Sequence, residues 1–452
     1  MTMPRHLRDR SAGSQVSGLA SSPADNAWIV NFDTGNINRN NRNNHNRALA
    51  VCRPVPASES QGVTYKELYQ ALRKARHGKV ASANQLRFDY LWMDRLLELQ
   101  KALNNFTWKP RPSTCFVVQR PKARQIHAPD FSDRVVHHAI VPTLEAEYDP
   151  TFIFDSYANR KGKGSHKAVQ RVQQFVRQVH SGQGGGWYLQ IDIKNFFPSL
   201  SREKLWARMK PRLERAGIAP WIMRATHALL RQSVEKTGVI YRCRPTELAS
   251  VPKYKRLENA APGCGLPAGN LSSQFLANVY LDPFDQFVKR TLGVQRYARY
   301  VDDMVLIHRD RAQLEAWLEQ IRDFLRNELA LELKDGIILR PLSAGIDFLG
   351  YVTFPTHTRV RRRVLQHANE KLRDWSQQHM GKRGATGTPA DYRQLQSIWA
   401  SYCGHMRHAN SFRLRQNFHR RLPWLASLTG VRRRFSHQLE GRSIHIRTKS
   451  HE

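Results

Sequence analysis

Apolar residues recur at three- and four-residue spacing along much of the chain, which places them on one face of an amphipathic helix. This pattern predicts helices over 63–78, 88–105, 133–149, 201–217, 220–234 and 312–331. Shorter apolar runs of strand-like composition lie at 114–120, 124–129, 187–193, 296–310 and 348–354. Alternating helices and strands, followed from about residue 359 by a basic helical pattern, indicate an α+β core with an all-helical C-terminal unit.

Three features interrupt this pattern. Residues 1–60 are rich in Ser, Asn and Arg, with Asn repeating from Asn36 to Asn46, and we expect a disordered arm there. Residues 243–262 form a polar insert that contains Pro and Lys. Pro198 predicts a turn after the run at 187–193, because proline disfavours a helix interior.

The charge balance of the chain is strongly basic. Lys and Arg number 72 against 37 Asp and Glu, which gives a formal net charge of +35. Such an excess favours a polyanionic partner, with nucleic acid the leading candidate. On charge alone, a solvated basic surface, a ribosome-associated protein and a membrane-surface protein remain alternatives.

The cysteines do not form a metal or disulfide pattern, because none belongs to a CxxC pair. They are Cys52, Cys115, Cys243, Cys264 and Cys403. Isolated thiols suit a reducing compartment. No apolar run is long enough to cross a bilayer, and the basic N-terminus lacks the apolar stretch of a secretory signal. We therefore expect a soluble, cytoplasmic protein with no membrane partner.

Three aspartates occupy positions where a charge is unexpected without a function. Asp302 and Asp303 lie in the sequence YVDD between two strand-like halves, and Asp192 ends the apolar run LQID. Buried carboxylates are costly unless something neutralises them, and two-metal phosphoryl transfer needs carboxylates from separate segments. An ordinary Asp-rich turn for the pair and a capping role for Asp192 are the alternatives.

A glycine-containing loop forms the third element, with the sequence GLPAGNLSSQ over 265–274. Its two glycines and proline predict a tight turn, and the polar residues after it can begin a helix. Such backbone can approach a base pair or a sugar closely, although a plain helix start would use the same residues.

In this order and spacing the elements resemble the motifs of reverse transcriptases, and specifically bacterial ones. IDIKNFF, GLPAGNLSSQ and YVDDMVL are similar to the three palm motifs, and IDFLGYVTF is similar to the primer-grip segment. QRPKARQIHAPDFSDRVVHHAI and FDSYANRKGKGSH resemble fingers motifs, and SYCGHMRHANSFRLR resembles the helical thumb. The resemblance covers roughly residues 63–425.

The resemblance implies an α+β right-hand polymerase, with fingers and palm built from an antiparallel sheet plus helices and with a helical thumb. It also implies RNA-directed DNA polymerase activity with two Mg²⁺ ions, for which Mn²⁺ can substitute. The implied partners are template RNA, cDNA or primer, and deoxynucleoside triphosphates. The implied divisions are the arm at 1–60, fingers at 61–186, palm at 187–355 with a helical insert at about 201–262, thumb at 356–428 and a basic tail at 429–452.

Family roles transfer to matching positions of this sequence. Asp192, Asp302 and Asp303 are the implied catalytic acids, and with Ile193 they form the implied metal site. The residues implied to contact the incoming nucleotide are Lys122, Arg124, Phe197, Ala268, Gln274 and Lys334. Those implied to contact primer or template are Gly265, Gly269, Tyr300, Leu349, Gly350, Arg361, Arg362 and Arg363.

The chemistry of the side chain suits several of these roles. The Phe197 ring stands at the position that excludes a ribose 2′-hydroxyl, and Lys334 matches a lysine that can protonate pyrophosphate. Arg124, beside Lys122, can grip phosphate oxygens bidentately. For all three basic residues, a generic phosphate contact is the alternative.

Two features indicate a subclass. Ser273 and Gln274 stand where group II intron and retroviral enzymes typically have Ser-Pro, and the pattern is similar to enzymes of diversity-generating retroelements. The Asn-rich segment beginning NAWIVNFDTG is similar to the variable segment of target proteins in those elements. We interpret residues 24–54 as a translated template repeat or the product of a start codon placed too far upstream. A flexible RNA-binding leader is the alternative.

Other functions stay open from the sequence. A phage-defence or other unclassified bacterial reverse transcriptase fits the same motifs, as does an RNA-binding protein on a polymerase fold. No DNA-binding or endonuclease domain is recognised after the thumb, which counts against a mobile group II intron protein. A small basic helper protein is a further candidate partner.

Overall fold

The computed structural model describes residues 62–429, apart from 79, 120–121, 182–184, 233–236 and 382–383, and four short strands outside that span. These strands are β1 (Ala27–Asn31), β2 (Asn36–Asn40), β3 (Val51–Cys52) and β16 (Ile444–Ile446). Strands β2-β1-β3 form one antiparallel sheet. The rest of the expected arm and tail lies outside the described residues, and these strands do not test the interpretation of 24–54 as a template repeat.

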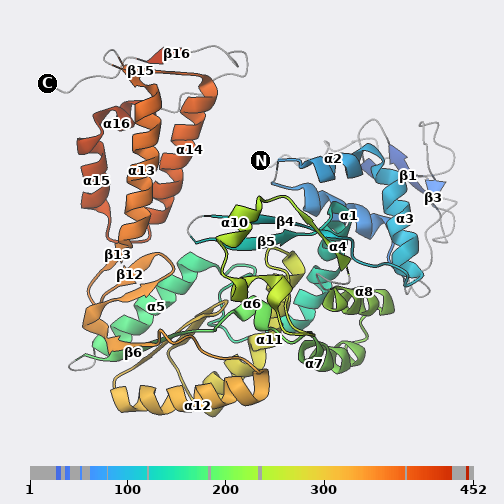
Figure 1. Ribbon diagram of the computed structural model, residues 1–452, viewed down its shortest axis with the longest axis horizontal. Coiled ribbons are helices and arrows are strands. Elements are labelled where there is room, and N and C mark those ends of the chain that lie inside the picture. Colours follow the sequence, from blue (N-terminus) through green and yellow to red (C-terminus); the bar gives the residue numbers. More distant parts are fainter. Residues whose placement is uncertain are drawn as a thin grey trace, which may run out of the picture.

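A four-stranded antiparallel sheet in the order β10-β6-β9-β8 forms the centre of the fold (Figure 1). Its strands are β6 (Trp187–Asp192), β8 (Tyr297–Tyr300), β9 (Asp303–His308) and β10 (Ile338–Pro341). The hairpin expected over 296–310 is confirmed as β8 and β9. Strand β10 pairs with β6 at the other edge and was not expected from the sequence.

Both faces of this sheet are buried. Leu189 and Ile191 pack on one face in a core shared with α11 (Leu271–Gln286) and α12 (Arg311–Leu329). Tyr188 packs on the opposite face, in a core shared with α5 (Ser165–His180). Because side chains alternate along a strand, the polar residues at even positions of β6 lie on the α5 face.

Several helices and two strands of a second, smaller sheet precede β6 in the sequence, and the third strand, β7, follows it. The sheet has the order β5-β4-β7, with β4 and β5 antiparallel and β4 and β7 parallel. Helix α1 is capped by Thr64, whose hydroxyl accepts from the Glu67 N–H in a capping box. The bounds are α1 (Tyr65–Arg76), α2 (Ala83–Tyr90), α3 (Trp92–Asn104), β4 (Ser113–Val118), β5 (Arg124–Ala128), α4 (Phe131–Tyr148) and β7 (Val239–Tyr241).

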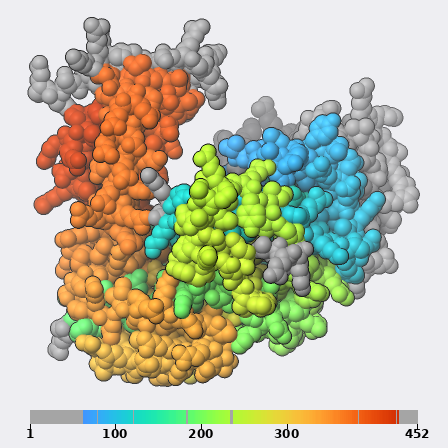
Figure 2. Space-filling view, viewed as in Figure 1, coloured from blue at the N-terminus to red at the C-terminus, as the bar shows by residue number. Residues whose placement is uncertain are grey.

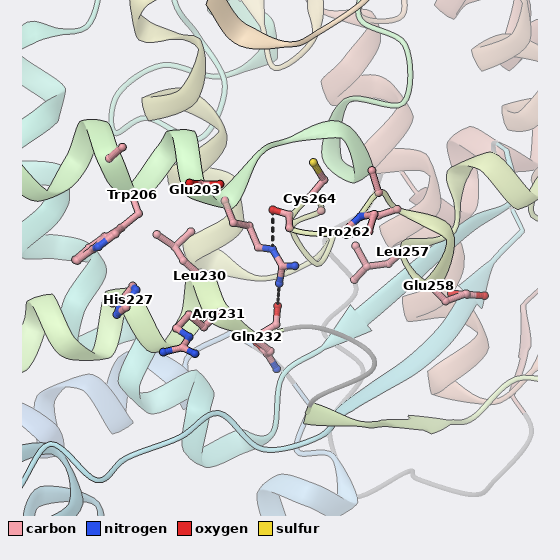
Figure 3. Close-up of a pocket in the computed structure, with 16 residues that line it drawn as sticks. Glu203, Trp206, His227, Leu230, Arg231, Gln232, Leu257, Glu258, Pro262 and Cys264 are labelled. Carbon is pink, nitrogen blue, oxygen red and sulfur yellow. Dashed lines mark hydrogen bonds between the residues drawn. The ribbon is translucent and has the colours of Figure 1, made fainter.

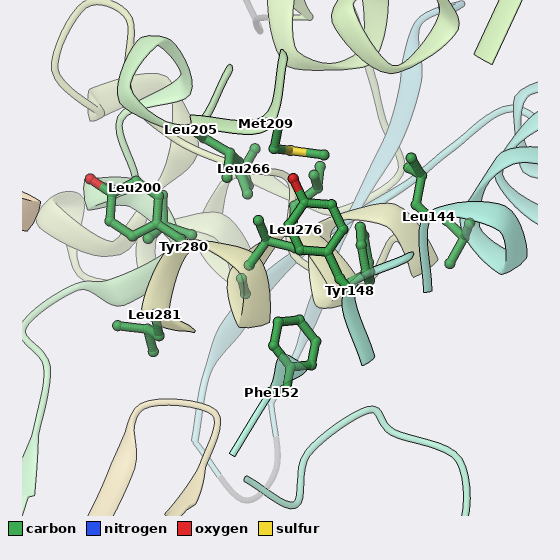
Figure 4. Close-up of a cluster of buried hydrophobic side chains, with 14 of the residues drawn as sticks. Leu144, Tyr148, Phe152, Leu200, Leu205, Met209, Leu266, Leu276, Tyr280 and Leu281 are labelled. Carbon is green, nitrogen blue, oxygen red and sulfur yellow. The ribbon is translucent and has the colours of Figure 1, made fainter. Parts of the chain in front are cut away.

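The glycine-containing loop is anchored in the main core through Leu266. Figure 4 shows Leu266 among Leu205, Met209 and Leu276, all of which are buried in the same cluster. This anchor fixes the loop relative to the helices that follow β6. Those helices are α6 (Phe196–Ser199), α7 (Arg202–Arg215), α8 (Pro220–Arg231) and α10 (Pro245–Ala249).

The C-terminal part consists of a small sheet and a helical bundle with its own core. The sheet contains β11 (Ile346–Phe348), β12 (Tyr351–Thr353) and β13 (Thr358–Val360). The bundle contains α13 (Arg362–His379), α14 (Pro389–Met406), α15 (Phe412–Arg421) and α16 (Pro423–Thr429), with β14 (Met380–Gly381) and β15 (Gly384–Gly387) at one end. Figure 2 shows the surface hollowed between these orange helices and the yellow-green segment that contains α10.

Several sequence expectations need correction. The helix expected over 88–105 is divided at Leu91, whose ψ of 41° interrupts it between α2 and α3. Pro198 does not exclude a helix, because it lies in the first turn of α6, where a missing N–H costs no hydrogen bond. The single strand expected over 348–354 is a hairpin that turns at Leu349 and Gly350, with φ values of 51° and 90°. Helix α5 was missed.

None of the described helices combines the length and the apolar character that a membrane span requires.

Candidate active site

Asp192 and Asp303 lie directly opposite each other in the central sheet. Asp192 ends β6, Asp303 begins β9, and the two form an antiparallel register pair. Directly opposed residues project from the same face with Cβ atoms about 4.5–5.5 Å apart. The sheet therefore places two carboxylates of separate segments side by side.

Asp302 is brought to the same place by a strained turn. It follows Val301 in the connection between β8 and β9, and Val301 has a φ of 56°, in the left-handed region that β-branched residues rarely adopt. The guanidinium of Arg299 donates to the Val301 carbonyl oxygen at 3.0 Å. This hydrogen bond comes from a fully buried side chain and holds the turn in place.

Two of the three carboxylates, those of Asp302 and Asp303, have raised pKa values. Burial, and next the nearby Asp192 carboxylate, raise the pKa of Asp302 to about 6. Burial also raises the pKa of Asp303 to about 7, against the lowering effect of a hydrogen bond from Gln190. A concentration of carboxylates with raised pKa values is the arrangement that a bound cation stabilises.

The donor set fits divalent metal ions. Oδ1 of Asp192 is buried without a hydrogen-bond partner, which leaves a carboxylate oxygen for a ligand. No three described His, Cys, Asp or Glu side chains are already spaced as a metal cage. The ions would therefore need further oxygens from backbone and substrate phosphates, as Mg²⁺ commonly does.

Ile193 can contribute only through its backbone. Its side chain is fully buried in the main core. The Lys334 N–H donates to the Asp192 carbonyl oxygen at 2.9 Å, and the Lys194 N–H donates to the Glu332 carbonyl oxygen at 2.8 Å. Since carbonyls alternate in direction along a strand, the Ile193 carbonyl faces the opposite edge, toward β9.

Lys334 is also in direct contact with the carboxylates. Its ammonium forms an ion pair with Oδ2 of Asp192, and both side chains are about two-fifths exposed, at 42% and 39%. A cation from the chain itself thus touches one of the expected metal ligands.

The glycine-containing loop links the site to the β5 strand. The Leu266 N–H donates to the Phe197 carbonyl oxygen at 3.0 Å, and the Ala268 carbonyl oxygen accepts from the His127 N–H at 3.1 Å. Gly269 has a φ of 109°, and a Cβ there would lie 2.9 Å from the Ile126 side chain. Only glycine allows this approach between the loop and β5.

Phe197 lies close to this loop in a half-buried position. Its ring meets the buried Phe196 ring edge to face, with centroids 5.4 Å apart. Gln274 is half-buried in the first turn of α11, and Gly265 is buried with a φ of 95°. Tyr300 is half-buried and pairs with Asp303 across the hairpin.

Two groups of expected residues are not joined to the carboxylates by contact. Lys122 and Arg124 lie exposed on the β4–β5 side, and no hydrogen bond or ion pair links either to the three aspartates. Leu349 and Gly350 form the turn of the β11–β12 hairpin. Arg361, Arg362 and Arg363 are exposed at the start of α13.

Sequence reasoning missed residues that support the site. Gln190 donates to Oδ1 of Asp303 at 3.0 Å, and Asp347 pairs with the expected Arg361 at 3.0 Å. The buried Arg299 is paired with the buried Asp285 at 2.6 Å. A signal was available, because Gln190 and Arg299 are polar residues inside apolar strand patterns.

A pocket of about 510 Å³ lies apart from the carboxylates, between α7, α8 and the segment 257–265 (Figure 3). The Trp206 and His227 rings stack at one end, with centroids 4.7 Å apart. The Arg202 guanidinium donates to the Gly263 carbonyl oxygen at 3.2 Å within it. None of the three aspartates lines this pocket, so it is not part of the candidate active site.

Comparisons with known proteins identify several relatives of this chain. Protein YkfC of Escherichia coli (strain K12) is 25% identical over 263 residues, covering 51% of this chain and 63% of YkfC. The group II intron-encoded protein LtrA of Lactococcus lactis subsp. cremoris is 21% identical over 329 residues, covering 62% of this chain and 54% of LtrA. The chain thus spans between half and two thirds of the length of these curated relatives.

Among solved structures, apo telomerase from Candida Tropicalis is similar with a TM-score of 0.42 and 10% identity, covering 59% of this chain and 60% of that one. Residues 109–336, half of the chain, match the family described as reverse transcriptase (RNA-dependent DNA polymerase). The three aspartates lie within this matched region, with Asp192 and Asp303 on paired strands and Asp302 in the turn between β8 and β9. The chain therefore belongs to the reverse transcriptase family and has its α+β polymerase fold of fingers, palm and helical thumb.

Proposed function

We propose that this chain is an RNA-directed DNA polymerase, which extends a primer along template RNA with deoxynucleotides. The observation that carries the proposal is the convergence of Asp192, Asp302 and Asp303 at one end of the central sheet. Mg²⁺ or Mn²⁺ ions held there would activate the primer 3′-hydroxyl and balance the charge of the triphosphate. Asp192 and Asp302 are the proposed ligands, and Asp303 is the accompanying acid.

The remaining roles follow the path of the substrates. Lys122 and Arg124 would hold triphosphate oxygens, and Lys334 would donate a proton to the departing pyrophosphate. The loop from Gly265 to Gln274 would lie against the nascent base pair. Leu349 and Gly350, with the arginines that begin α13, would hold the primer strand. In this assignment the proposed fingers, palm and thumb divisions are those implied by the sequence motifs.

The experiment is primer extension on an RNA template with Mg²⁺ and deoxynucleotides. Asp302→Asn should reduce extension to below about 5% of wild type, because a lost metal ligand removes transition-state stabilisation. RNA affinity should stay within about twofold, since the basic surface is unchanged. Asp310→Asn is the matched control, because Asp310 caps α12 at the far end of the same hairpin and Asn also caps helices. Extension by Asp302→Asn at wild-type level would contradict the assignment.

At a finer level, we propose that the polymerase belongs to a diversity-generating retroelement and makes error-prone cDNA. The supporting features are the Ser273-Gln274 ending of the loop and the Asn-rich segment 24–54. Ala268 offers no long polar side chain, and its carbonyl is already used by His127. Weak bracing of the nascent pair reduces the free-energy gap between right and wrong nucleotides, and each loss of about 1.4 kcal/mol lowers the discrimination tenfold.

A defined RNA that covers codons 24–54 tests this finer proposal, with sequencing of the cDNA products. Errors concentrated opposite template adenine would support it, and Ala268→Gln should reduce them. Uniformly low errors, with any helper protein encoded beside the gene supplied, would favour a defence-related polymerase instead. The relatives named above do not separate these two possibilities.

A further inference from the structure

The side-chain amide of Gln190 connects the carboxylate of Asp303 to a separate hairpin. Its Nε2 donates to Oδ1 of Asp303 at 3.0 Å and to the carbonyl oxygen of Asp347 at 3.1 Å. Gln190 lies two positions before Asp192 on β6, so both side chains project from the same face of the sheet. Asp347 belongs to β11, in the hairpin that turns at Leu349 and Gly350.

The surroundings determine which way this amide points. Both partners, a carboxylate oxygen and a backbone carbonyl oxygen, are acceptors, so only the NH₂ end of the amide can face them. The other end of the amide, Oε1 of Gln190, is buried and has no hydrogen-bond partner. Leaving a buried acceptor unsatisfied is unfavourable, and such an arrangement persists where the other contacts of the group require it.

The hairpin does not depend on Gln190 for its attachment to the sheet. The hydroxyl of Tyr188 donates to the Gly345 carbonyl oxygen at 3.1 Å, and Phe348 is buried in the core beneath α5. The ion pair of Asp347 with Arg361 joins the same hairpin to the start of α13. Gln190 therefore adds a link between an already docked hairpin and a catalytic carboxylate.

We propose that Gln190 is a positioning residue that fixes the Asp303 carboxylate relative to the β11–β12 hairpin. The inference rests on the proposed polymerase function, in which this hairpin holds the primer end. Through Gln190, the position of the primer and the orientation of a metal-site carboxylate are set by one amide. Hydrogen bonds that orient a metal-site carboxylate commonly change metal affinity or activity by about 10–100-fold when they are removed.

The chain contains a matched control for this arrangement. The amide of Gln286 donates to Oδ1 of Asp282 at 3.0 Å and to the Thr151 carbonyl oxygen at 2.9 Å, and its Oε1 is likewise buried without a partner. It lies at the end of α11, outside the proposed active site. Gln190→Met and Gln286→Met each remove one hydrogen bond to a carboxylate and one hydrogen bond to a backbone carbonyl oxygen.

The experiment measures three quantities for wild type and both variants: kcat for primer extension, Kd for a primer–template duplex, and Mn²⁺ affinity of the free protein by electron paramagnetic resonance. Gln190→Met should lower kcat and Mn²⁺ affinity by about 10-fold or more, with duplex Kd within about twofold. Gln286→Met should leave all three unchanged. Gln190→Glu keeps the size of the side chain but places an acceptor against two acceptors, so it should lower kcat and Mn²⁺ affinity at least as much.

The outcomes separate the two proposals. If wild type fails to extend a primer, the proposed function is wrong, while the Mn²⁺ titration still tests Gln190 on its own. If Gln190→Met matches Gln286→Met in both kcat and Mn²⁺ affinity, Gln190 has no positioning role. A loss of kcat accompanied by an equal loss of duplex affinity would also overturn the inference, because it would reflect a displaced hairpin rather than a misoriented carboxylate.

Discussion

Lys334 is bound to Asp192 at two points, through its backbone and through its side chain. The Lys334 N–H donates to the Asp192 carbonyl oxygen at 2.9 Å, and the Lys334 ammonium pairs with the Asp192 carboxylate. The backbone bond keeps the lysine beside the aspartate, while a long flexible side chain lets its charge move away. The ammonium can therefore neutralise the carboxylate without metal and leave when a divalent ion arrives.

Competition between this ammonium and the metal leads to a prediction about Lys334→Ala. Removing the ammonium should lower the Mg²⁺ concentration for half-maximal extension, because the ion no longer displaces a paired cation. The same change should lower kcat, by about 10²–10⁴-fold if Lys334 supplies the proton to pyrophosphate. Steady-state extension across a Mg²⁺ titration measures both effects.

Lys210→Ala is the control, since Lys210 pairs with the exposed Glu214 one helical turn away. It should change neither quantity. An increased requirement for Mg²⁺ in Lys334→Ala would show that Lys334 supports the metal site rather than competes with the metal.

The half-buried ring of Phe197 gives a second prediction, about sugar selection. Phe197→Ala should increase the use of ribonucleotides relative to deoxynucleotides, because a ring at this position would clash with a 2′-hydroxyl. The measurement is the ratio of kcat/KM for the ribo- and deoxy- forms of one nucleotide. The packing of Phe197 on Phe196 provides an internal check, since general disorder would lower both values and leave their ratio unchanged.

The buried ion pair beneath the YVDD turn gives a third prediction, about stability. Asp285 is fully buried, and its carboxylate accepts from Arg299 and from the Tyr297 hydroxyl, the latter at 2.7 Å. Asp285→Leu should lower the free energy of unfolding by about 3–5 kcal/mol, because it leaves a buried guanidinium without its counter-charge. Urea unfolding measures this quantity.

The surface pair of Arg311 and Glu315 is the comparison, with both side chains about half exposed. Glu315→Gln should cost about 1 kcal/mol or less. If the two substitutions had equal effects on unfolding, the buried pair would not be holding the fold beneath the turn. Primer extension of Asp285→Leu at a temperature where it remains folded should still be reduced, because Arg299 also donates to the Val301 carbonyl.

The aspartates could be predicted from the sequence because each broke an apolar pattern that the fold itself explains. Asp192 and Asp303 end and begin strands that pair in register, so two local patterns converge without information from elsewhere. The left-handed Val301 could not be predicted, because nothing local favours a β-branched residue there. Its conformation depends on Arg299, whose partners come from segments up to 143 positions away in the sequence.

The sequence patterns also failed to predict elements whose stability comes from tertiary contacts. Strand β10 has an apolar start but an exposed Arg340 and Pro341 at its end, and it forms because β6 offers a free edge. The division of 348–354 into two strands depends on the positive φ of Leu349. In the sequence, the neighbouring Gly350 is the sign of a turn there. Gln190 illustrates the same limit, since its position in β6 was visible but its partner Asp347 was not.

A buried acid in α4 gives the last prediction, which concerns pH. Asp133 is 1% exposed, its Oδ2 accepts from the Arg111 N–H at 2.7 Å, and its Oδ1 is buried without a partner. Burial raises the pKa of Asp133 from its ordinary value to about 8, so the folded protein keeps a proton there that the unfolded chain releases above about pH 4. The stability from this group is fully present below about pH 4 and is lost as the pH rises through about 8.

Asp133→Asn keeps the shape and an acceptor for Arg111 but cannot ionise. Urea unfolding at several pH values between 4 and 8.5 should therefore show wild type losing unfolding free energy relative to Asp133→Asn as the pH increases. A constant difference between the two proteins across this range would mean that Asp133 is ionised in the folded state, and a difference of the opposite sign would mean that an unseen cation holds its charge.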